Sequence, residues 1–177
     1  MAFVFIVLLS PVMAVVAILV KLTSQGPILF WSSRVGRNGM MFRMPKFRTM
    51  TTCSKIMARE IASNEDCKMT PIGRFLRRSS LDELPQLWSI LKGDMSFIGP
   101  RPLLPCDTVS ILRTQYREIT SIRPGLTGLA QVNGRNFVTP RNKARYDAFY
   151  ARRACGILDA KIILATFRIL HRVDFVK

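Results

Sequence analysis

The chain has 177 residues, enough for one ordinary domain, and 49% of them are hydrophobic. Lys and Arg number 27 against 11 Asp and Glu, and the formal net charge of +16 predicts an anionic partner: nucleic acid, an anionic membrane or a phosphorylated substrate. Four cysteines without a C-x-x-C spacing and a single histidine, His171, argue against a zinc site and against Ser-His-Asp or Cys-His catalysis.

Residues 1–20 form an uncharged apolar run that ends before Lys21. The run just reaches the length of about 20 apolar residues that a membrane-spanning helix needs. At its midpoint Pro11 leaves the carbonyl of Val7 without a backbone donor, and the Ser10 hydroxyl can donate to that carbonyl instead. We expect either a re-entrant helix-break-helix that enters and leaves on one face, or a kinked transmembrane helix. In both cases the downstream excess of Lys and Arg places the remaining chain on the cytoplasmic side.

A β-hairpin is expected after the apolar run. Residues 26–33 are typical of a strand, and Asn38-Gly39 is typical of a tight hairpin turn. Residues 42–50 are expected to form only an edge strand or an extended loop, because Pro45 has no N–H to donate to a neighbouring strand.

The middle of the chain predicts a loop and two helices. Residues 51–69 are expected to form a surface excursion or mobile loop, and residues 70–80 a short helix opened by a Thr-Pro pair. Leucines at helical spacing then predict a helix that begins near Asp82, because Pro85 is tolerated only in a first turn. Residues 92–94 are expected to end this helix.

The last third of the chain predicts mainly helices. The expected fold class is therefore α+β, with an apolar N-terminal segment over residues 1–22 and a mainly helical cytosolic domain over residues 23–177 that contains a small β-hairpin. The expected segments are an extended loop at 99–105, an amphipathic helix at 107–122, a glycine-punctuated stretch at 123–136 with a turn at Asn133-Gly134, and helices at 141–155 and 157–173.

Asp82 and Glu83 form an acidic pair at the start of an expected helix, in a chain with few carboxylates. They are either a helix cap and a partner of the helix dipole, or part of a reactive site at a helix N-terminus, where anions bind well. Arg77, Arg78 and Arg101 favour the second alternative, because carboxylates can hold a divalent metal while guanidinium groups hold phosphate oxygens. A carboxylate can also attack phosphorus directly. A diphosphate is the group that most needs carboxylate, Mg²⁺ and arginine together.

Several longer motifs carry a family resemblance. The segments "KFRTM" at 46–50, "SLDELPQLWSILKGDMSFIGPRPLLP" at 80–105 and "RPGLTGLAQVNGRN" at 123–136 resemble the bacterial sugar transferases, the monotopic phosphoglycosyl transferases. Ser10-Pro11 is similar to the break in that family's re-entrant membrane helix, and "GPILF" and "RVGRNG" are similar to its early strands. The resemblance thus implies an N-terminal re-entrant membrane helix-break-helix over residues 1–22, followed by a cytosolic catalytic domain with interfacial amphipathic helices. The motifs follow the family's order across nearly the whole chain.

The resemblance implies transfer of a sugar-1-phosphate from a UDP-sugar to polyprenol (undecaprenyl) phosphate, giving polyprenyl-diphosphate-sugar and UMP. It implies that Asp82 is the nucleophile, forming a phosphosugar-aspartyl intermediate, and that Glu83 helps the dyad to hold Mg²⁺. The reaction would be the first membrane step of bacterial glycoconjugate synthesis (glycan, O-antigen, capsule or glycoprotein), at the cytoplasmic face of the inner membrane. The alternatives are an ordinary membrane-associated glycosyltransferase that moves sugar without phosphate, and a non-catalytic basic membrane-binding protein. Nucleic acid is not expected, since aromatic and basic residues do not interleave.

The resemblance also assigns substrate residues. Arg77 is expected to bind phosphate, and Pro100-Arg101-Pro102 is either a nucleotide-contacting element, with the guanidinium stacked on uracil, or a structural turn. The other substrate-site candidates are polar residues of two motifs: Lys46 and Arg48, which line a phosphate groove or face solvent, and Arg123, Gln131, Asn133 and Arg135.

The helix expected over residues 157–173 has apolar residues, such as Ile162 and Ile169, largely opposite Lys161, Arg168 and Arg172. Such a helix either packs on the core or lies in the membrane interface with its basic side toward anionic headgroups, as the resemblance favours. The membrane lipids are thus expected partners beside the two substrates.

Overall fold

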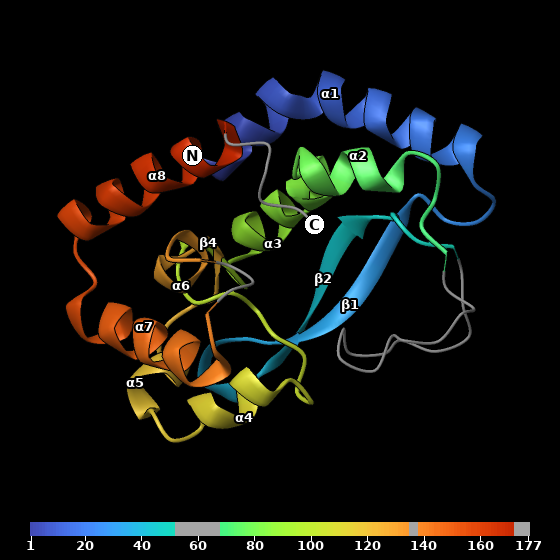
Figure 1. Cartoon of the computed structure of the whole chain (residues 1–177). Coiled ribbons are helices and arrows are strands. Elements are labelled where there is room, and N and C mark those ends of the chain that lie inside the picture. The colour runs from blue at the N-terminus through green and yellow to red at the C-terminus, as the bar shows by residue number, and fades with distance from the viewer. Residues whose placement is uncertain (52–67, 135–137, 172–177) are drawn as a thin grey trace. The chain divides into compact units, whose positions relative to one another are not determined.

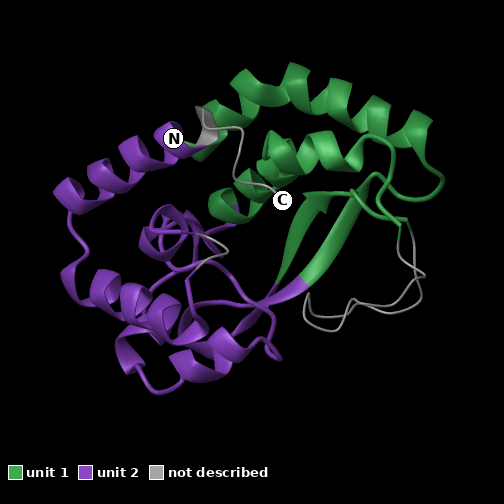
Figure 2. Cartoon of the chain, in the orientation of Figure 1, with its two compact units in different colours: residues 1–32, 43–91 green, residues 33–42, 92–177 purple. Residues whose placement is uncertain are grey.

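The computed structural model describes residues 1–51, 68–134 and 138–171, a mixture of helices and short strands with one apolar helix at the N-terminus. Two compact units divide the chain (Figure 2). Unit 1 contains residues 1–32 and 43–91, and unit 2 contains residues 33–42 and 92–177. The apolar N-terminal helix therefore belongs to the same unit as the acidic pair. Of the predicted surface loop at 51–69, residues 52–67 lie outside the described ranges.

Unit 1 consists of helices and one end of a hairpin (Figure 1). Its elements are α1 (Ala2–Thr23), parts of the paired strands β1 (Leu29–Val35) and β2 (Met41–Phe47), α2 (Gly73–Arg78), the 3₁₀ helix η2 (Leu81–Gln86) and α3 (Leu87–Lys92). The predicted end of the last helix is confirmed, since α3 stops at Lys92 and Gly93 takes a φ of 87°, a conformation that favours glycine.

The carboxyl half of α1 packs into the core of unit 1. Val16 and Val20 of α1 are buried in one cluster with Phe47 of β2 and Leu76 of α2. The α1 helix continues across Pro11, and the predicted local repair is present, because the Ser10 hydroxyl donates to the Val7 carbonyl at 2.7 Å. In Figure 1 the α1 ribbon arches over α2, as expected of a helix with an interior proline.

The hairpin turn forms where the sequence predicts it. Asn38 and Gly39 both take positive φ angles, 56° and 75°, within the 3₁₀ turn η1 (Arg37–Gly39). Two consecutive positive φ angles match the twist of the flanking strands, which is why Asn-Gly suits this position. Pro45 lies within β2, and it is accommodated because, among the residues that the structure describes, β2 pairs with β1 on one edge and has no partner strand on the other.

The helix predicted to begin near Asp82 is a 3₁₀ helix over its first part. Because Pro85 has no N–H to give to the carbonyl of Leu81, the segment closes with tighter bonds, such as Glu83 N–H to Ser80 C=O at 3.2 Å. Ser80 precedes the segment with a φ of 58° and no side-chain cap. The predicted helix start near Asp82 is confirmed, and Asp82 and Glu83 lie in the first turn; that turn is 3₁₀ rather than α, and its N-cap is Ser80 rather than Asp82.

Unit 2 is built around a short parallel pair of strands, β3 (Ser96–Ile98) and β4 (Gly125–Thr127), with Ser96 opposite Gly125 and Ile98 opposite Thr127. Its helices are α4 (Thr108–Arg113), α5 (Arg117–Thr120), α6 (Leu129–Val132), α7 (Pro140–Arg153) and α8 (Gly156–His171). The two long C-terminal helices confirm the sequence prediction.

Two features of unit 2 differ from the sequence expectations. The helix predicted over 107–122 is split into α4 and α5, because Tyr116 takes an extended conformation and the bonds nearby tighten, as in Tyr116 N–H to Arg113 C=O at 2.9 Å. The glycine-punctuated stretch contains a strand and a helix, each too short to show a periodic pattern.

We expect Gly125→Ala to destabilise unit 2 strongly. A Cβ at this position would lie 2.1 Å from the Gly99 nitrogen and 2.6 Å from its Cα, and neither backbone atom can yield as a side chain would. The free energy of unfolding should fall by about 2 kcal/mol or more. Thermal unfolding measures the loss, with Gly156→Ala as the control, since a Cβ there meets nothing within 4 Å. Equal melting temperatures for the two variants would contradict the close approach.

Candidate active site

The acidic pair is held within unit 1 by its burial and by a cation from β2. Asp82 is buried, with 7% of its surface exposed. Glu83 is largely buried and accepts a hydrogen bond from the Lys46 ammonium group, with Nζ 2.8 Å from Oε1. The two side chains of this ion pair are 18% and 12% exposed. Lys46 therefore reaches the dyad, and the expectation that it faces solvent is wrong.

The Arg77 side chain is anchored to the segment that follows β2. It lies in the last turn of α2, and its Nε donates to the Thr49 hydroxyl at 2.9 Å. Thr49 is itself buried, and its carbonyl accepts the backbone N–H of Thr70 at 3.0 Å. The Nε side of this guanidinium is thus fixed, which would reduce the entropy lost if the Arg77 guanidinium bound an anion.

Arg48 is buried and bonds to the residue that caps α1. Its side chain is buried, at 4% exposure, and one terminal nitrogen donates to the Ser24 carbonyl at 2.7 Å and to the Ser24 hydroxyl at 2.6 Å. Ser24 is the C-cap of α1, where a cation interacts favourably with the helix dipole. Arg48 therefore links the segment that follows β2 to the carboxyl end of α1. The solvent-facing alternative is wrong.

The proline-flanked arginine lies in unit 2, in the predicted extended loop after β3. Pro100 and Pro102 are buried and Arg101 is half-buried. The Pro100 carbonyl accepts the N–H of Gly125 at 2.9 Å. The loop is thus fixed at its backbone, as a structural turn would be, while a part of the Arg101 side chain stays accessible.

The remaining described candidates, Arg123, Gln131 and Asn133, lie in the segment that contains β4 and α6 of unit 2. Arg123 is exposed. Gln131 donates to the Leu126 carbonyl at 3.2 Å, and Asn133 donates to the Leu129 carbonyl at 2.8 Å, so that both amides bind the local backbone. Arg135 lies outside the described residues. The site candidates therefore divide between the units: Lys46, Arg48, Arg77, Asp82 and Glu83 belong to unit 1, and the others belong to unit 2.

The donor set of the dyad fits Mg²⁺. No group of three or more His, Cys, Asp and Glu side chains gathers among the described residues, so a site made entirely by protein ligands is not present in that part of the chain. Mg²⁺ does not require one, because it is commonly bound by one or two carboxylates together with water and substrate phosphates. Asp82 and Glu83 supply carboxylates of that kind.

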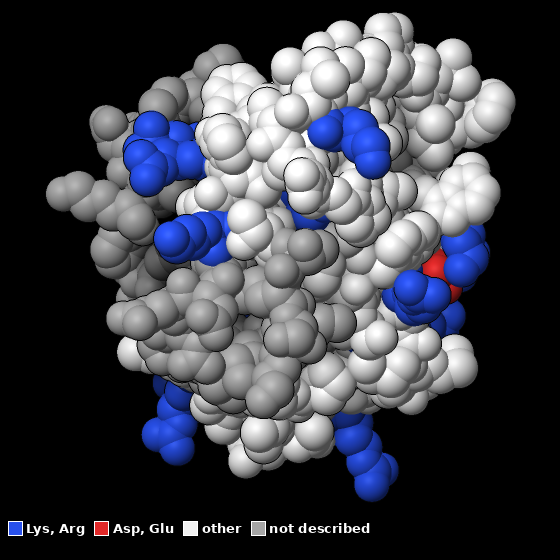
Figure 3. Space-filling model, turned by 90° about the vertical axis from the view of Figure 1, so that its right-hand side faces the viewer, with Lys and Arg blue, Asp and Glu red and all other residues white. Residues whose placement is uncertain are grey.

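Positive charge outweighs negative charge on the face drawn in Figure 3. On the face drawn in Figure 3, Lys and Arg side chains stand out and little acidic surface is visible. This distribution agrees with the net charge of +16 and would raise the local concentration of an anionic substrate.

Sequence reasoning missed two contributors, Thr49 and Arg113. Thr49 lies within the "KFRTM" motif, but its partner Arg77 is 28 residues away and no periodic pattern connects them. Arg113 donates to the Arg101 carbonyl at 2.7 Å, a contact that the expected helix over 107–122 gives no reason to anticipate.

Comparison with known proteins agrees with the motifs. The family model described as bacterial sugar transferase matches residues 1–172. A Klebsiella pneumoniae protein named UDP-glucose:undecaprenyl-phosphate glucose-1-phosphate transferase is 39% identical over 173 residues, covering 91% of this chain and 36% of the relative. A Salmonella typhimurium undecaprenyl-phosphate galactose phosphotransferase is 34% identical over 191 residues, covering 96% of this chain and 38% of its own length.

A shorter relative matches over most of its length. The Bacillus subtilis protein, an uncharacterised sugar transferase, is 38% identical over 152 residues, which cover 84% of this chain and 72% of that protein. The chain thus spans somewhat more than a third of the first two relatives and nearly three quarters of the third.

Proposed function

The chain belongs to the bacterial sugar transferase family, and from this premise we propose that it transfers a sugar-1-phosphate from a UDP-sugar to polyprenol phosphate, releasing UMP. The family match over residues 1–172 is the observation that carries the proposal, and it includes both Asp82 and the proline-flanked Arg101. The relatives' names specify different sugars, glucose and galactose, so the proposal leaves the sugar open. Such a product begins the assembly of a lipid-linked glycoconjugate.

The chemistry divides into two displacements at one phosphorus. A carboxylate oxygen of Asp82 attacks the sugar-side phosphorus, the bond from that phosphorus to the bridging oxygen breaks, and UMP leaves with the bond's electrons. A phosphate oxygen of the polyprenol phosphate then attacks the same phosphorus and expels the Asp82 carboxylate. Lys46 keeps Glu83 in place beside the nucleophile, and Arg77 faces the anionic groups with its Nε already fixed by Thr49.

Asp82 and Glu83 are the residues that would hold Mg²⁺. When bound, the ion would neutralise charge on phosphate oxygens and stabilise a phosphate leaving group. The protein's own cations would share this task, since arginine binds phosphate through a fixed, multidentate set of donors.

A panel of UDP-sugars tests the proposed activity. Purified protein in detergent or nanodiscs is incubated with each UDP-sugar and undecaprenyl phosphate, and the nucleotide product is identified by chromatography. UMP with a lipid diphosphate-sugar is the expected pair, lost in excess chelator and restored by added Mg²⁺. UDP as the product would instead show a glycosyltransferase that moves sugar without phosphate, and the absence of any turnover would leave a non-catalytic membrane-binding protein.

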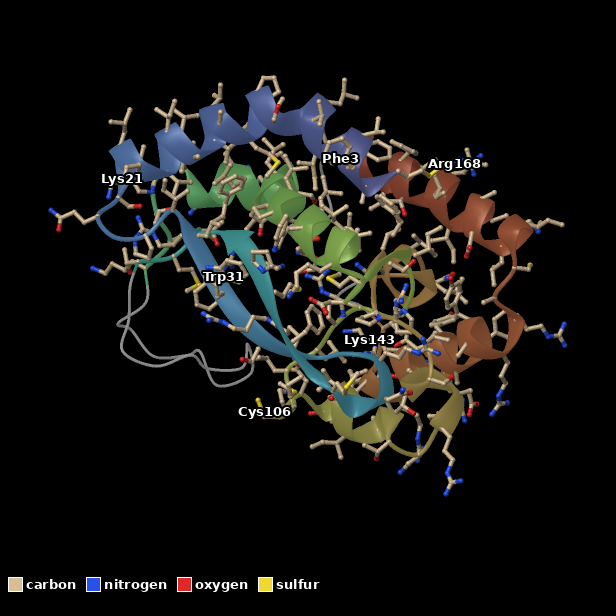
Figure 4. The ribbon with its side chains drawn as sticks, turned by 180° about the vertical axis from the view of Figure 1, so that it is seen from behind. Phe3, Lys21, Trp31, Cys106, Lys143 and Arg168 are labelled. Atoms are coloured by element: carbon tan, nitrogen blue, oxygen red, sulfur yellow. The ribbon has the colours of Figure 1, made fainter. Side chains whose placement is uncertain are left out.

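The proposed site of action is the cytoplasmic face of the bacterial inner membrane. The described residues contain one helix long and apolar enough to cross a membrane, α1. Only 11% of its most apolar stretch is buried inside the protein. Figure 4 labels Phe3 and Lys21 near its two ends and shows side chains that project from α1 on the side away from α2. On α8, Ile157, Ile163, Leu164 and Phe167 are also exposed, which favours the proposal that α8 lies in the interface.

Packing favours a re-entrant α1 over a full span. Val16 and Val20 are buried against Phe47 and Leu76, so that one face of the carboxyl half of α1 is covered by protein, while Val15 and Ile18 of the same half stay exposed. The two arms on either side of Ser10-Pro11, of about ten residues each, rise only about 15 Å each, half of a hydrocarbon core of about 30 Å. The interior proline and the Ser10 hydrogen bond allow the helix to turn back.

We expect Ser10→Leu combined with Pro11→Leu to move the N-terminus across the membrane, because the bend and its repair would both be lost. A cysteine at Phe3, 64% exposed, is introduced after the four native cysteines are changed to serine. An impermeant maleimide should label the parent in permeabilised cells only, and the leucine variant in intact spheroplasts. A control cysteine at Gln25 should remain unlabelled in intact spheroplasts of both the parent and the leucine variant. Labelling of the parent from the periplasmic side would contradict the re-entrant arrangement.

A further inference from the structure

The loop that carries Arg101 is held at its backbone from several directions. Within unit 2, the N–H of Gly99 donates to the Thr127 carbonyl at 2.9 Å, and the Leu103 carbonyl accepts the N–H of Val35 at 3.1 Å. The N–H of Leu104 donates to a carboxylate oxygen of Asp107 at 2.9 Å. The Arg101 carbonyl is held in another way, because it accepts a hydrogen bond from a charged side chain.

That side chain is Arg113, at the last residue of α4, and three of its nitrogens are used. One terminal nitrogen donates to the Arg101 carbonyl at 2.7 Å. Nε and the other terminal nitrogen both donate to the same oxygen of Asp147 in α7, at 3.0 and 2.5 Å. Asp147 is 1% exposed and Arg113 is 13% exposed, so that the whole arrangement is shielded from water. The rigid guanidinium therefore holds the Arg101 carbonyl at a fixed position relative to Asp147 of α7.

A stability role alone does not account for this pair. Buried ion pairs often contribute no more stability than well-packed apolar residues of similar volume, because both charges lose their hydration. Here burial raises the pKa of the Asp147 carboxyl despite the neighbouring Arg113, so that the ionised form is costly at this place. Unlike an apolar pair, this ion pair provides a directed hydrogen-bond donor to the Arg101 carbonyl. Lysine could not replace it, since an ammonium group cannot hold both partners in a fixed plane.

We propose that Arg113, oriented by Asp147, is a positioning residue that presents Arg101 to the nucleotide part of the substrate. This inference rests on the proposed function, in which Arg101 contacts the nucleotide of a UDP-sugar. Arg113 itself touches neither substrate nor the reacting carboxylate in this scheme. Its loss should therefore weaken nucleotide binding while leaving the chemical step at Asp82 nearly unchanged.

The test replaces both charges at once, as Arg113→Met with Asp147→Leu, so that no unpaired charge remains in the interior. The KM for the UDP-sugar and the Kd for UMP should each rise about tenfold or more, as expected when a charge-assisted hydrogen bond is lost. The kcat should change by less than about threefold, and the melting temperature should stay near that of the parent. Arg113→Lys, which keeps the charge pair but not the planar fork, should raise KM in the same direction.

Two comparisons make the result decisive. The exposed pair Arg152–Glu118 joins α7 to α5 in the same unit, and changing it to Gln and Gln should leave KM unaltered. An unchanged KM and Kd in a folded double variant would overturn the proposal. If the double variant does not fold, the Lys variant decides, and an unchanged KM there overturns it equally. A parent protein that releases no UMP would instead contradict the proposed function.

Discussion

Asp82→Asn is expected to abolish turnover, lowering the rate of UMP release by about 10⁴-fold or more, a loss typical of removing a covalent nucleophile. The reason is chemical, because an amide cannot attack phosphorus as a carboxylate does. Asn has nearly the same volume as Asp, so the buried position within η2 keeps its packing. Steady-state UMP release, with unfolding temperature measured on the same preparation, gives the result.

A matched control applies the same chemical change elsewhere. Asp107 is a half-buried N-cap residue of α4, and its carboxylate accepts the N–H of Leu104. An asparagine oxygen can accept the same bond, so Asp107→Asn should leave activity and stability close to those of the parent. If Asp82→Asn retains more than a small percentage of turnover, Asp82 is not the nucleophile, and its role is reduced to that of a metal ligand or a base.

Local signals made part of the fold predictable. The Asn38-Gly39 turn and the helix end at Lys92 each depend on a few neighbouring residues whose backbone preferences are strong. The long C-terminal helices were predictable for the same reason, since an apolar period extends over many residues. The dyad was found because two adjacent carboxylates among arginines are unusual in a chain of such positive charge.

Long-range contacts explain the rest. Whether residues 81–86 form an α-helix or a 3₁₀ helix depends on which carbonyl each N–H reaches, and Ser80 adopts its left-handed φ without a sequence signal that demands it. The pairing of β3 with β4 joins three-residue strands separated by 26 residues of chain. Such strands are too short to show an alternation of apolar and polar residues in the sequence. The burial of Arg48 likewise follows from a partner, Ser24, that lies 24 residues earlier.

A covalent phosphosugar on Asp82 would separate the reaction into two independent halves. UDP-sugar alone, without polyprenol phosphate, is then expected to release one equivalent of UMP per active site in a rapid burst and to add the mass of one sugar phosphate to the protein. Polyprenol phosphate added afterwards should remove that mass. With both substrates varied, double-reciprocal plots of initial rates should be parallel, because the substrates need never occupy the site together.

The site of attachment can be identified by peptide mapping. Cleavage after Arg78 and Lys92 yields a peptide in which Asp82 and Glu83 are the only acidic side chains, and fragmentation can tell one from the other. An adduct on Glu83 would exchange the roles of the two carboxylates, and Asp82→Asn should carry no adduct. Intersecting lines, no burst and no adduct would favour direct attack by the lipid on the nucleotide sugar. That route would require both anionic substrates to bind at once. The positive surface would then have to offset the repulsion between their phosphate groups.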